Sequence, residues 1–498
     1  MGIPLPFRLE ASDVNVLLAI IGAWLLVHGA FSSYLKDRLY LSVPWSKKTD
    51  EDFVSCLLSR FFSFITRHLH DQSLTSWSGL SLLVGLAVGY FPYFANNDHR
   101  NPNTETGSFE ALESVTLDLS RLVLGLQLVY SGVRLPGRFL RLEWRSLALL
   151  LGPGLIVMWA CSGLIIYLLV PGLPVLAALA IAACITPTDP VLSASILQGH
   201  FADENLPEDL RNVIIAESGA NDGLGYLFVF FALRLFKWTG PDSPSTGGVG
   251  EAMSVYLSYT CLYVVICSIL YGAFVGWATN VLVQWATRKK VMDSESFFAT
   301  ATSMGLFILG TCGMAGVDDV LACFIAGNTL TWDDWFRVRT ESDSFEPTAD
   351  NILNVVMFVW LGAACPWRLF FTTELLPIWR LLLIAVMILL FRRLPITLTM
   401  KPYIRQIQHW RHALFVGYFG LIGVSAILYL HLGLQFTQRL VAADGSRHDI
   451  TMLNEAMTII TWFMVAVSVL VHGFSVPVIA LCGGSRARHI ALPISDDP

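Results

Sequence analysis

Two apolar segments carry polar side chains of the kinds that can bind a cation. The first, at 181–197, contains the run TPTDP at 186–190, which places an aspartate between two prolines. The second, at 212–236, reads NVIIAESGANDGLGYLFVFF over its first twenty residues and carries Glu217, Ser218, Asn221 and Asp222. A carboxylate in hydrocarbon costs about 2.5–3.5 kcal/mol even on lenient scales, so it normally faces a cavity or a partner. The two segments therefore predict an ion site.

The residue types fit a small hard cation. Ser218 and Asp222 lie four apart and share one face of a helix. The prolines remove amide donors and leave backbone carbonyls of 186–189 free, which is tolerated at membrane depth where the backbone lines protein or water. With Thr188, these groups offer the oxygens that such a cation requires. A carboxylate withdrawn from water also holds a proton more readily, so Asp222 could bind either a proton or sodium. A polar network that only joins helices is the alternative.

Composition places these segments in a polytopic membrane protein. Of 498 residues, 54% are hydrophobic and 14% charged, whereas soluble domains carry about a quarter charged residues. No basic patch with interleaved aromatics suggests nucleic acid. The nine cysteines lack metal-ligand spacing, and no HExxH or GxSxG motif is present, so we expect neither an enzyme nor a cofactor.

Thirteen apolar segments are long enough to be considered as membrane spans. They are 14–31, 79–95, 113–133, 146–170, 173–197, 210–236, 253–285, 297–316, 317–331, 350–371, 376–398, 410–432 and 452–476. Lysine and arginine concentrate in alternate loops and in the C-terminal tail. The positive-inside rule then predicts an external N-terminus and a cytoplasmic C-terminus.

A second interrupted span suggests an internal repeat. Segment 410–432 contains Gly417, Gly420 and Gly423, and paired helix-breaking segments in corresponding halves indicate a transporter built from inverted repeats. Two stretches are atypical: 42–78 is a long, charged and aromatic cytoplasmic insertion, and 478–498 is a short cytoplasmic tail.

These motifs resemble the monovalent cation/proton antiporter superfamily, specifically the fungal plasma-membrane sodium/proton antiporters. The resemblance is carried by ITPTDPVLSAS and AESGANDG, with DDVLACFIAGNTLTWDDWF at 318–336 and FRRLP at 391–395 as further matches. It implies an all-α protein of about 13 transmembrane helices, with inverted repeats and two crossed, unwound helices. Within the exchanger domain at 1–477, it implies a dimerisation part (14–133 and 253–371) and a core part (146–236 and 376–476).

The implied function is secondary active antiport. Such a protein exchanges intracellular Na⁺ or Li⁺, with K⁺ as a further candidate, for extracellular H⁺ across the plasma membrane. It is a homodimer in lipid, works by alternating access, needs no cofactor beyond the transported ions, and serves salt tolerance and pH homeostasis. The alternative is a non-transporting scaffold or sensor of the same fold. Loss of the Asn–Asp pair would mark it, and Asn221 and Asp222 are intact.

The resemblance also assigns roles to single residues. Asp222 is the shared ligand of cation and proton with Asn221 beside it, and Thr188 and Asp189 belong to the first unwound helix, so Asp222 and Thr188 would hold the transported Na⁺. Arg392 or Arg393 supplies a buried counter-charge for Glu217, with a purely structural ion pair as the alternative. Asp318 and Asp319 match a motif tied to transport, or else they cap a helix.

Two features depart from the family pattern or lie outside it. The second crossing reads FGLIGVSA, with Leu421 where relatives have proline and Ser425 where they have glycine, which leaves its unwinding open. His472 lies near the cytoplasmic end of the last span. A core histidine satisfied by backbone groups is favoured there over a pH sensor.

Overall fold

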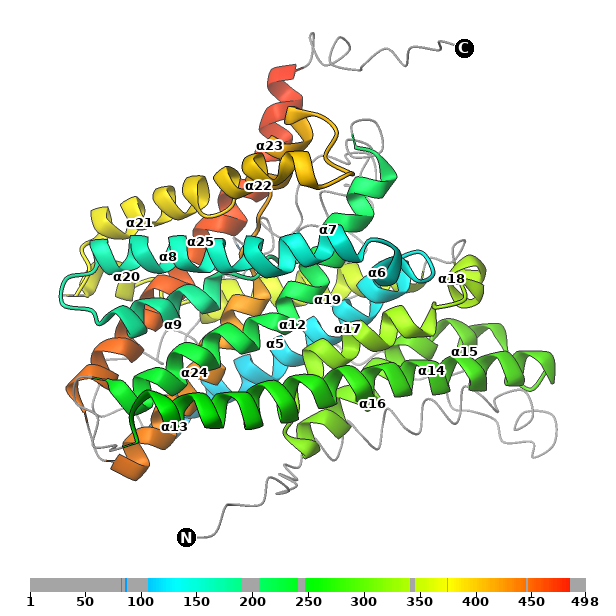
Figure 1. The fold of residues 1–498 in the computed structure, drawn as a ribbon, viewed down its shortest axis with the longest axis horizontal. Coiled ribbons are helices and arrows are strands. Elements are labelled where there is room, and N and C mark those ends of the chain that lie inside the picture. Colours follow the sequence, from blue (N-terminus) through cyan, green and yellow to red (C-terminus); the bar gives the residue numbers. More distant parts are fainter. Residues whose placement is uncertain are drawn as a thin grey trace, which may run out of the picture.

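The computed structural model describes residues 106–189, 206–240, 247–340, 345–373, 375–444 and 447–483, together with Leu82 and Leu86. Within these ranges every regular element is a helix (Figure 1). The first half contains α5 (Thr106–Arg134), α6 (Phe139–Leu142), α7 (Trp144–Leu149), η1 (Leu150–Gly154), α8 (Leu155–Leu169), α9 (Val175–Ile185), α12 (Glu208–Thr239), α13 (Gly248–Val255), η2 (Tyr256–Ile266) and α14 (Cys267–Arg288). The second half contains α15 (Ser294–Phe298), α16 (Thr300–Ala315), α17 (Asp319–Leu330), α18 (Trp335–Thr340), α19 (Phe345–Ala364), α20 (Leu369–Thr372), α21 (Ile378–Phe391), α22 (Leu394–Met400), η3 (Lys401–Tyr403), α23 (Trp410–Tyr418), α24 (Val424–Asp444) and α25 (His448–Gly483).

Helix α17 lies between α14 and α5, and small residues bring the three backbones together. A Cβ on Gly272 or Gly276 of α14 would overlap the carbonyl oxygens of Ala322 or Ala326 on α17. On its other side, a Cβ on Gly327 would overlap the Val129 carbonyl of α5. Lipid gives little hydrophobic drive between helices, so this close van der Waals contact is what holds membrane helices together.

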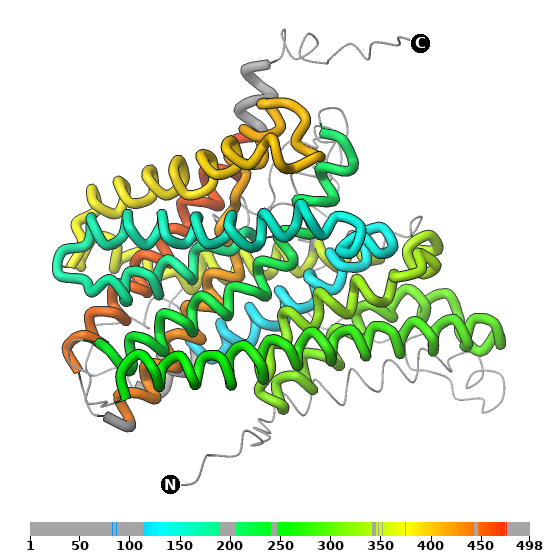
Figure 2. The backbone as a smooth tube through the Cα atoms, in the orientation of Figure 1, coloured from blue at the N-terminus to red at the C-terminus, as the bar shows by residue number. Residues whose placement is uncertain are grey.

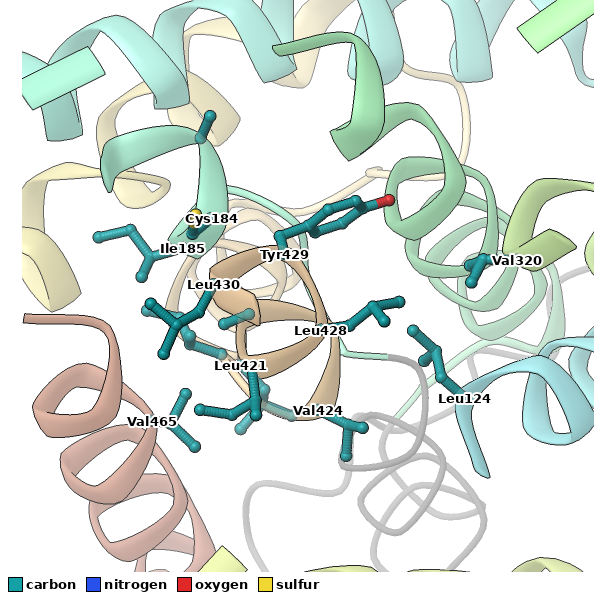
Figure 3. Close-up of a cluster of buried hydrophobic side chains, with 14 of the residues drawn as sticks. Leu124, Cys184, Ile185, Val320, Leu421, Val424, Leu428, Tyr429, Leu430 and Val465 are labelled. Carbon is teal, nitrogen blue, oxygen red and sulfur yellow. The ribbon is translucent and has the colours of Figure 1, made fainter. Parts of the chain in front are cut away.

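A second set of helices surrounds α24. Helix α24 contacts α9, α12 and α25, while α8 packs between α9 and α21 (Figure 2). The buried apolar residues of α24 include Val424, Leu428 and Leu430, and Leu421 just before the helix, Val465 of α25 and Ile185 of α9 lie close by (Figure 3). This packing places the ends of α9 and α23 and the start of α24 in the protein interior.

The described helices follow most of the predicted spans. Among the described residues, five helical stretches are long and apolar enough to cross a membrane: Trp144–Leu169, Gly248–Arg288, Thr348–Thr372, Ile378–Tyr403 and His448–Gly473. Segment 14–31, the insertion 42–78, most of 79–95 and the end of the tail fall outside the described residues. The count of thirteen and the division into dimerisation and core parts therefore stay predictions.

Two boundaries differ from expectation. Helix α25 continues to Gly483, into the stretch assigned to the tail, because the apolar sequence VPVIALCG sustains it. The span at 410–432 is interrupted as predicted, into α23 and α24, but the second helix runs on to Asp444, beyond the predicted end.

Candidate functional site

Helix α9 ends inside the protein at Ile185. Residues 186–189 are not helical, and the Thr186 hydroxyl turns back to donate to the Ala182 carbonyl at 2.6 Å. Pro187 has no amide hydrogen to continue the ladder, which is why the helix stops here. Thr186, Thr188 and Asp189 are all at most 1% exposed, so this non-helical backbone is lined by protein.

Helix α23 ends in the same region at Tyr418, and α24 starts at Val424. Phe419 has φ −81° and ψ 51°, near an inverse γ-turn, and the Gly420 amide donates to the Tyr418 carbonyl at 2.9 Å. The five residues 419–423 form the second break, although Leu421 takes the place of the proline that the family pattern predicts. Polar side chains from other parts of the chain bind the backbone groups of this break.

The two breaks are joined through Asp189. Its amide donates to the Leu421 carbonyl at 3.0 Å, and its carboxylate accepts from the Val424 amide at 2.6 Å. A Cβ on Gly423 would overlap that carboxylate, so glycine is required for this approach. Asp189 therefore places a negative group at the N-terminus of α24, where the helix dipole is positive.

Arg392 places a positive group at the C-terminal ends of α9 and α23. Its guanidinium donates to the Ile185 carbonyl, at the end of α9, and to the Gly420 carbonyl, in the second break. Both carbonyls lie at the negative ends of half-helices, where a cation is favourable. Asp189 and Arg392 thus balance the exposed dipoles of the crossing.

Helix α12 brings its polar face against the first break. The Asn221 side chain accepts from the Thr188 amide at 3.0 Å and donates to the Thr188 hydroxyl at 2.8 Å. That hydroxyl also lies 3.1 Å from the Ser218 hydroxyl. Asn221 is thereby a clamp on the non-helical backbone, and it leaves Thr188 and Ser218 oxygens gathered on one side of α12.

Asp222 lies beside this clamp and is fully buried. Within the described residues neither carboxylate oxygen has a hydrogen-bond partner of normal geometry, although the Ser425 hydroxyl and Asp189 are close enough to act on it. Its backbone is held by the Tyr429 hydroxyl, which donates to the Asp222 carbonyl. A buried carboxylate without such partners is costly unless a proton or a cation compensates its charge.

Glu217, one position before Ser218, is paired differently. The Arg393 guanidinium donates to its carboxylate at 2.6 Å and to the Val416 carbonyl at 2.8 Å, and both side chains are at most 3% exposed. Arg392 and Arg393 thus divide two tasks: Arg392 binds the helix ends, and Arg393 pairs with the acid of α12.

Asp318 and Asp319 lie at the start of α17, which packs against α12 next to Asp222, where a Cβ on Gly223 would overlap Leu321. The Asp318 carboxylate caps the helix by accepting from the Leu321 amide at 3.1 Å, and Asp319 forms an ion pair with Arg121 of α5. These geometries match the capping alternative for Asp318 and add a tie between helices for Asp319. The role of Asp318 and Asp319 in transport stays a prediction.

Two residues that contact the site, Tyr429 and Ser468, were not predicted from the sequence: the Tyr429 hydroxyl donates to the Asp222 carbonyl, and Ser468 contacts the second break. Ser425, noted in the sequence only as a departure from the family pattern, lies near Asp222. His472 is a buried histidine bound by backbone carbonyls, as predicted. Each is a single polar residue in an apolar run, a weak signal shared with many helix-packing residues. Among the described residues no group of three or more His, Cys, Asp or Glu side chains could hold a resident metal ion.

Comparison with known proteins gives a consistent picture. The family described as "Sodium/hydrogen exchanger, transmembrane" matches residues 54–482. The chain is 35% identical over 436 residues to Na(+)/H(+) antiporter 2 of Zygosaccharomyces rouxii, covering 85% of this chain and 52% of that protein. It is 31% identical over 438 residues to a Na(+)/H(+) antiporter of Schizosaccharomyces pombe, covering 86% and 90%.

The fold matches a solved antiporter structure. The sodium proton antiporter MjNhaP1 from Methanocaldococcus jannaschii superimposes with a TM-score of 0.57 at 16% identity, over 84% of this chain and 97% of that one. At this identity the likeness concerns the fold, which is that of a sodium/proton antiporter. The chain spans about half the length of several curated relatives that it matches, such as the Na(+)/H(+) antiporter of Saccharomyces cerevisiae, of which it covers 42%.

Proposed function

The chain belongs to the sodium/hydrogen exchanger family, and from this premise we propose that it is a secondary active antiporter that exchanges Na⁺ or Li⁺ for H⁺. Potassium is a further candidate cargo. The observation that carries the proposal is Asp222: a fully buried carboxylate without a hydrogen-bond partner of normal geometry among the described residues. The relatives named as Na(+)/H(+) antiporters support the choice of ions.

In this proposal Asp222 is the group for which the proton and the cation compete. A sodium ion there would take oxygens from the Asp222 carboxylate and from the Thr188 and Ser218 hydroxyls, which the Asn221 clamp holds nearby. When the cation leaves, a proton neutralises the buried carboxylate, because an uncompensated charge in that position is too costly. Only the sodium-bound and the protonated forms of the site, in which the Asp222 charge is compensated, then move between the two sides of the membrane.

The remaining elements of the proposal concern the assembly. A moving core part, a homodimer in lipid, the plasma membrane and an external N-terminus are supported by the sequence resemblance and by the bias of basic loops. A non-transporting scaffold or sensor of the same fold is the alternative. It would not need Asp222, Thr188 and Ser218 gathered at a crossing of two helix breaks.

The proposal is tested in vesicles from cells that lack their own antiporters, by measuring how added Na⁺, Li⁺ or K⁺ dissipates a proton gradient. We expect dissipation with Na⁺ and Li⁺, and its loss in Asp222→Asn, which is nearly isosteric but neither takes up a proton nor supplies the negative charge that favours a cation. Asp209→Asn is the matched control, because Asp209 is an exposed carboxylate in the first turn of the same helix. Exchange retained by Asp222→Asn at equal membrane levels would refute the role of Asp222. A silent wild-type chain would refute antiport.

A further inference from the structure

Two polar side chains of α25 contact the second break on both sides of its turn. The Ser468 hydroxyl accepts from the Ile422 amide at 2.9 Å, and the Nε2 atom of His472 lies 3.0 Å from the Tyr418 carbonyl oxygen. Ser468 and His472 are four residues apart on one helix face and at most 1% exposed. They therefore span the break from Tyr418 to Ile422.

A neutral imidazole carries one ring hydrogen, and both ring nitrogens of His472 lie near a carbonyl oxygen, which only accepts. In the tautomer with the hydrogen on Nε2, His472 donates to the Tyr418 carbonyl. Nδ1 lies 3.3 Å from the Ser468 hydroxyl and accepts its hydrogen. The result is a continuous chain of hydrogen bonds from the Ile422 amide through Ser468 and the imidazole to the Tyr418 carbonyl.

The surroundings of the ring add a constraint. Nδ1 is also 2.9 Å from the Ser468 carbonyl oxygen, a contact that is favourable only when Nδ1 carries a hydrogen. With a second proton on the ring, Nδ1 would donate to this carbonyl and could no longer accept from the Ser468 hydroxyl. The Arg392 guanidinium is a charged group close enough to act on the His472 imidazole. The Tyr418 and Phe419 rings pack against the same imidazole.

The length and register of this break determine where Asp189 and Ser425 lie relative to Asp222. Between Tyr418 and Ile422 the backbone offers the Gly420 carbonyl to Arg392 and the Leu421 carbonyl to the Asp189 amide. Immediately after it, the Val424 amide binds the Asp189 carboxylate, and Ser425 lies against Asp222. A shift of the break would displace both Asp189 and Ser425 relative to Asp222.

We propose that Ser468 and His472 are positioning residues of the transport site. They hold the second break at a fixed length and register without touching the ion, so the affinity of Asp222 for the cation depends on them. This inference rests on the proposed antiport. It predicts an effect on apparent cation affinity, whereas a role in packing alone would lower the amount of folded protein and leave affinity unchanged.

The test compares Ser468→Ala with Thr461→Val in the vesicle assay, with apparent KM and Vmax normalised to protein in the membrane. Thr461 lies two turns earlier on the same face of α25, is fully buried, and its hydroxyl has no hydrogen-bond partner within the described residues. We expect Ser468→Ala to raise the KM for Na⁺ roughly threefold to tenfold, the equivalent of one hydrogen bond, and Thr461→Val to leave it unchanged. Ser468→Thr keeps the hydroxyl and should restore the wild-type KM.

His472 gives a second measurement that does not depend on the behaviour of Ser468→Ala. His472→Gln keeps a donor for the Tyr418 carbonyl and should hold the KM closer to the wild-type value than His472→Leu does. Unchanged KM in both Ser468→Ala and His472→Leu, or an equal rise in Thr461→Val, would overturn the inference while antiport stands. Absence of exchange in the wild-type chain would overturn both.

Discussion

Two buried carboxylates lie five positions apart on α12 and are compensated differently: Asp222 has no hydrogen-bond partner of normal geometry among the described residues. Glu217 has a cationic partner, Arg393, with both side chains at most 3% exposed. Removing one member of such a pair leaves the other charge buried without compensation, which costs about 3–5 kcal/mol. We therefore expect Glu217→Gln and Arg393→Gln each to lower the melting temperature in detergent strongly, and the double variant to recover much of the loss.

The exposed pair between Arg405 and Glu143 provides the control. Its N–O distance is also 2.6 Å, but the Arg405 side chain is 78% exposed. Solvent-exposed pairs contribute about 0–1 kcal/mol, so Arg405→Gln should hardly shift the melting temperature. Losses that simply add in the Glu217→Gln/Arg393→Gln double variant would show that the two charges do not act as a pair.

At the residue scale the sequence predicted the types of side chain but not their division of labour. Arg392 and Arg393 are adjacent, about 100° apart on a helix, and either could face Glu217. Helix α21 ends at Phe391, and only the backbone path through that end decides which one does. His472 interacts with Tyr418 across 54 positions in the chain, a contact that no local pattern reveals.

At the scale of elements, close helix packing yields a prediction that is independent of the ion site. A Cβ on Gly276 would overlap the backbone carbonyl of Ala326, which cannot move away as a side-chain tip can. We expect Gly276→Ala to separate α14 from α17 and to destabilise the protein by about 1–3 kcal/mol, the usual range for overpacking. Gly152→Ala is the matched control, since no atom lies within 4 Å of the Cβ added there. Thermal unfolding in detergent distinguishes them, and equal melting temperatures would contradict the packing argument.

The two breaks show what sequence patterns can and cannot supply at this scale. TPTDP predicted the first break because Pro187 lacks the amide that a helix requires. The second break was uncertain because Leu421 stands where relatives have proline. The structure shows the reason that it persists: Asp189, Arg392, Ser468 and His472 provide the partners for its backbone groups. Those partners come from the residue after α21, from α25 and from the first break, so segment 410–432 alone could not reveal them.

At the scale of the whole molecule, the charges of the site predict how exchange responds to voltage. Glu217 is neutralised by Arg393, and Asp189 and Arg392 stay bound to the helix ends of the crossing. In the proposed antiport, this leaves Asp222 as the one carboxylate among these site residues for which the transported ions would compete. Its protonated and sodium-bound forms carry the same net charge, so the moving part would cross the membrane with equal charge in each direction. We expect Na⁺/H⁺ exchange in proteoliposomes to proceed at the same rate at zero and at imposed membrane potential, with a potential-sensitive dye confirming that the potential is present. A rate that rises with inside-negative potential and falls when it is reversed would mean that a second carboxylate, Asp189 being the nearest candidate, also exchanges its proton during the cycle.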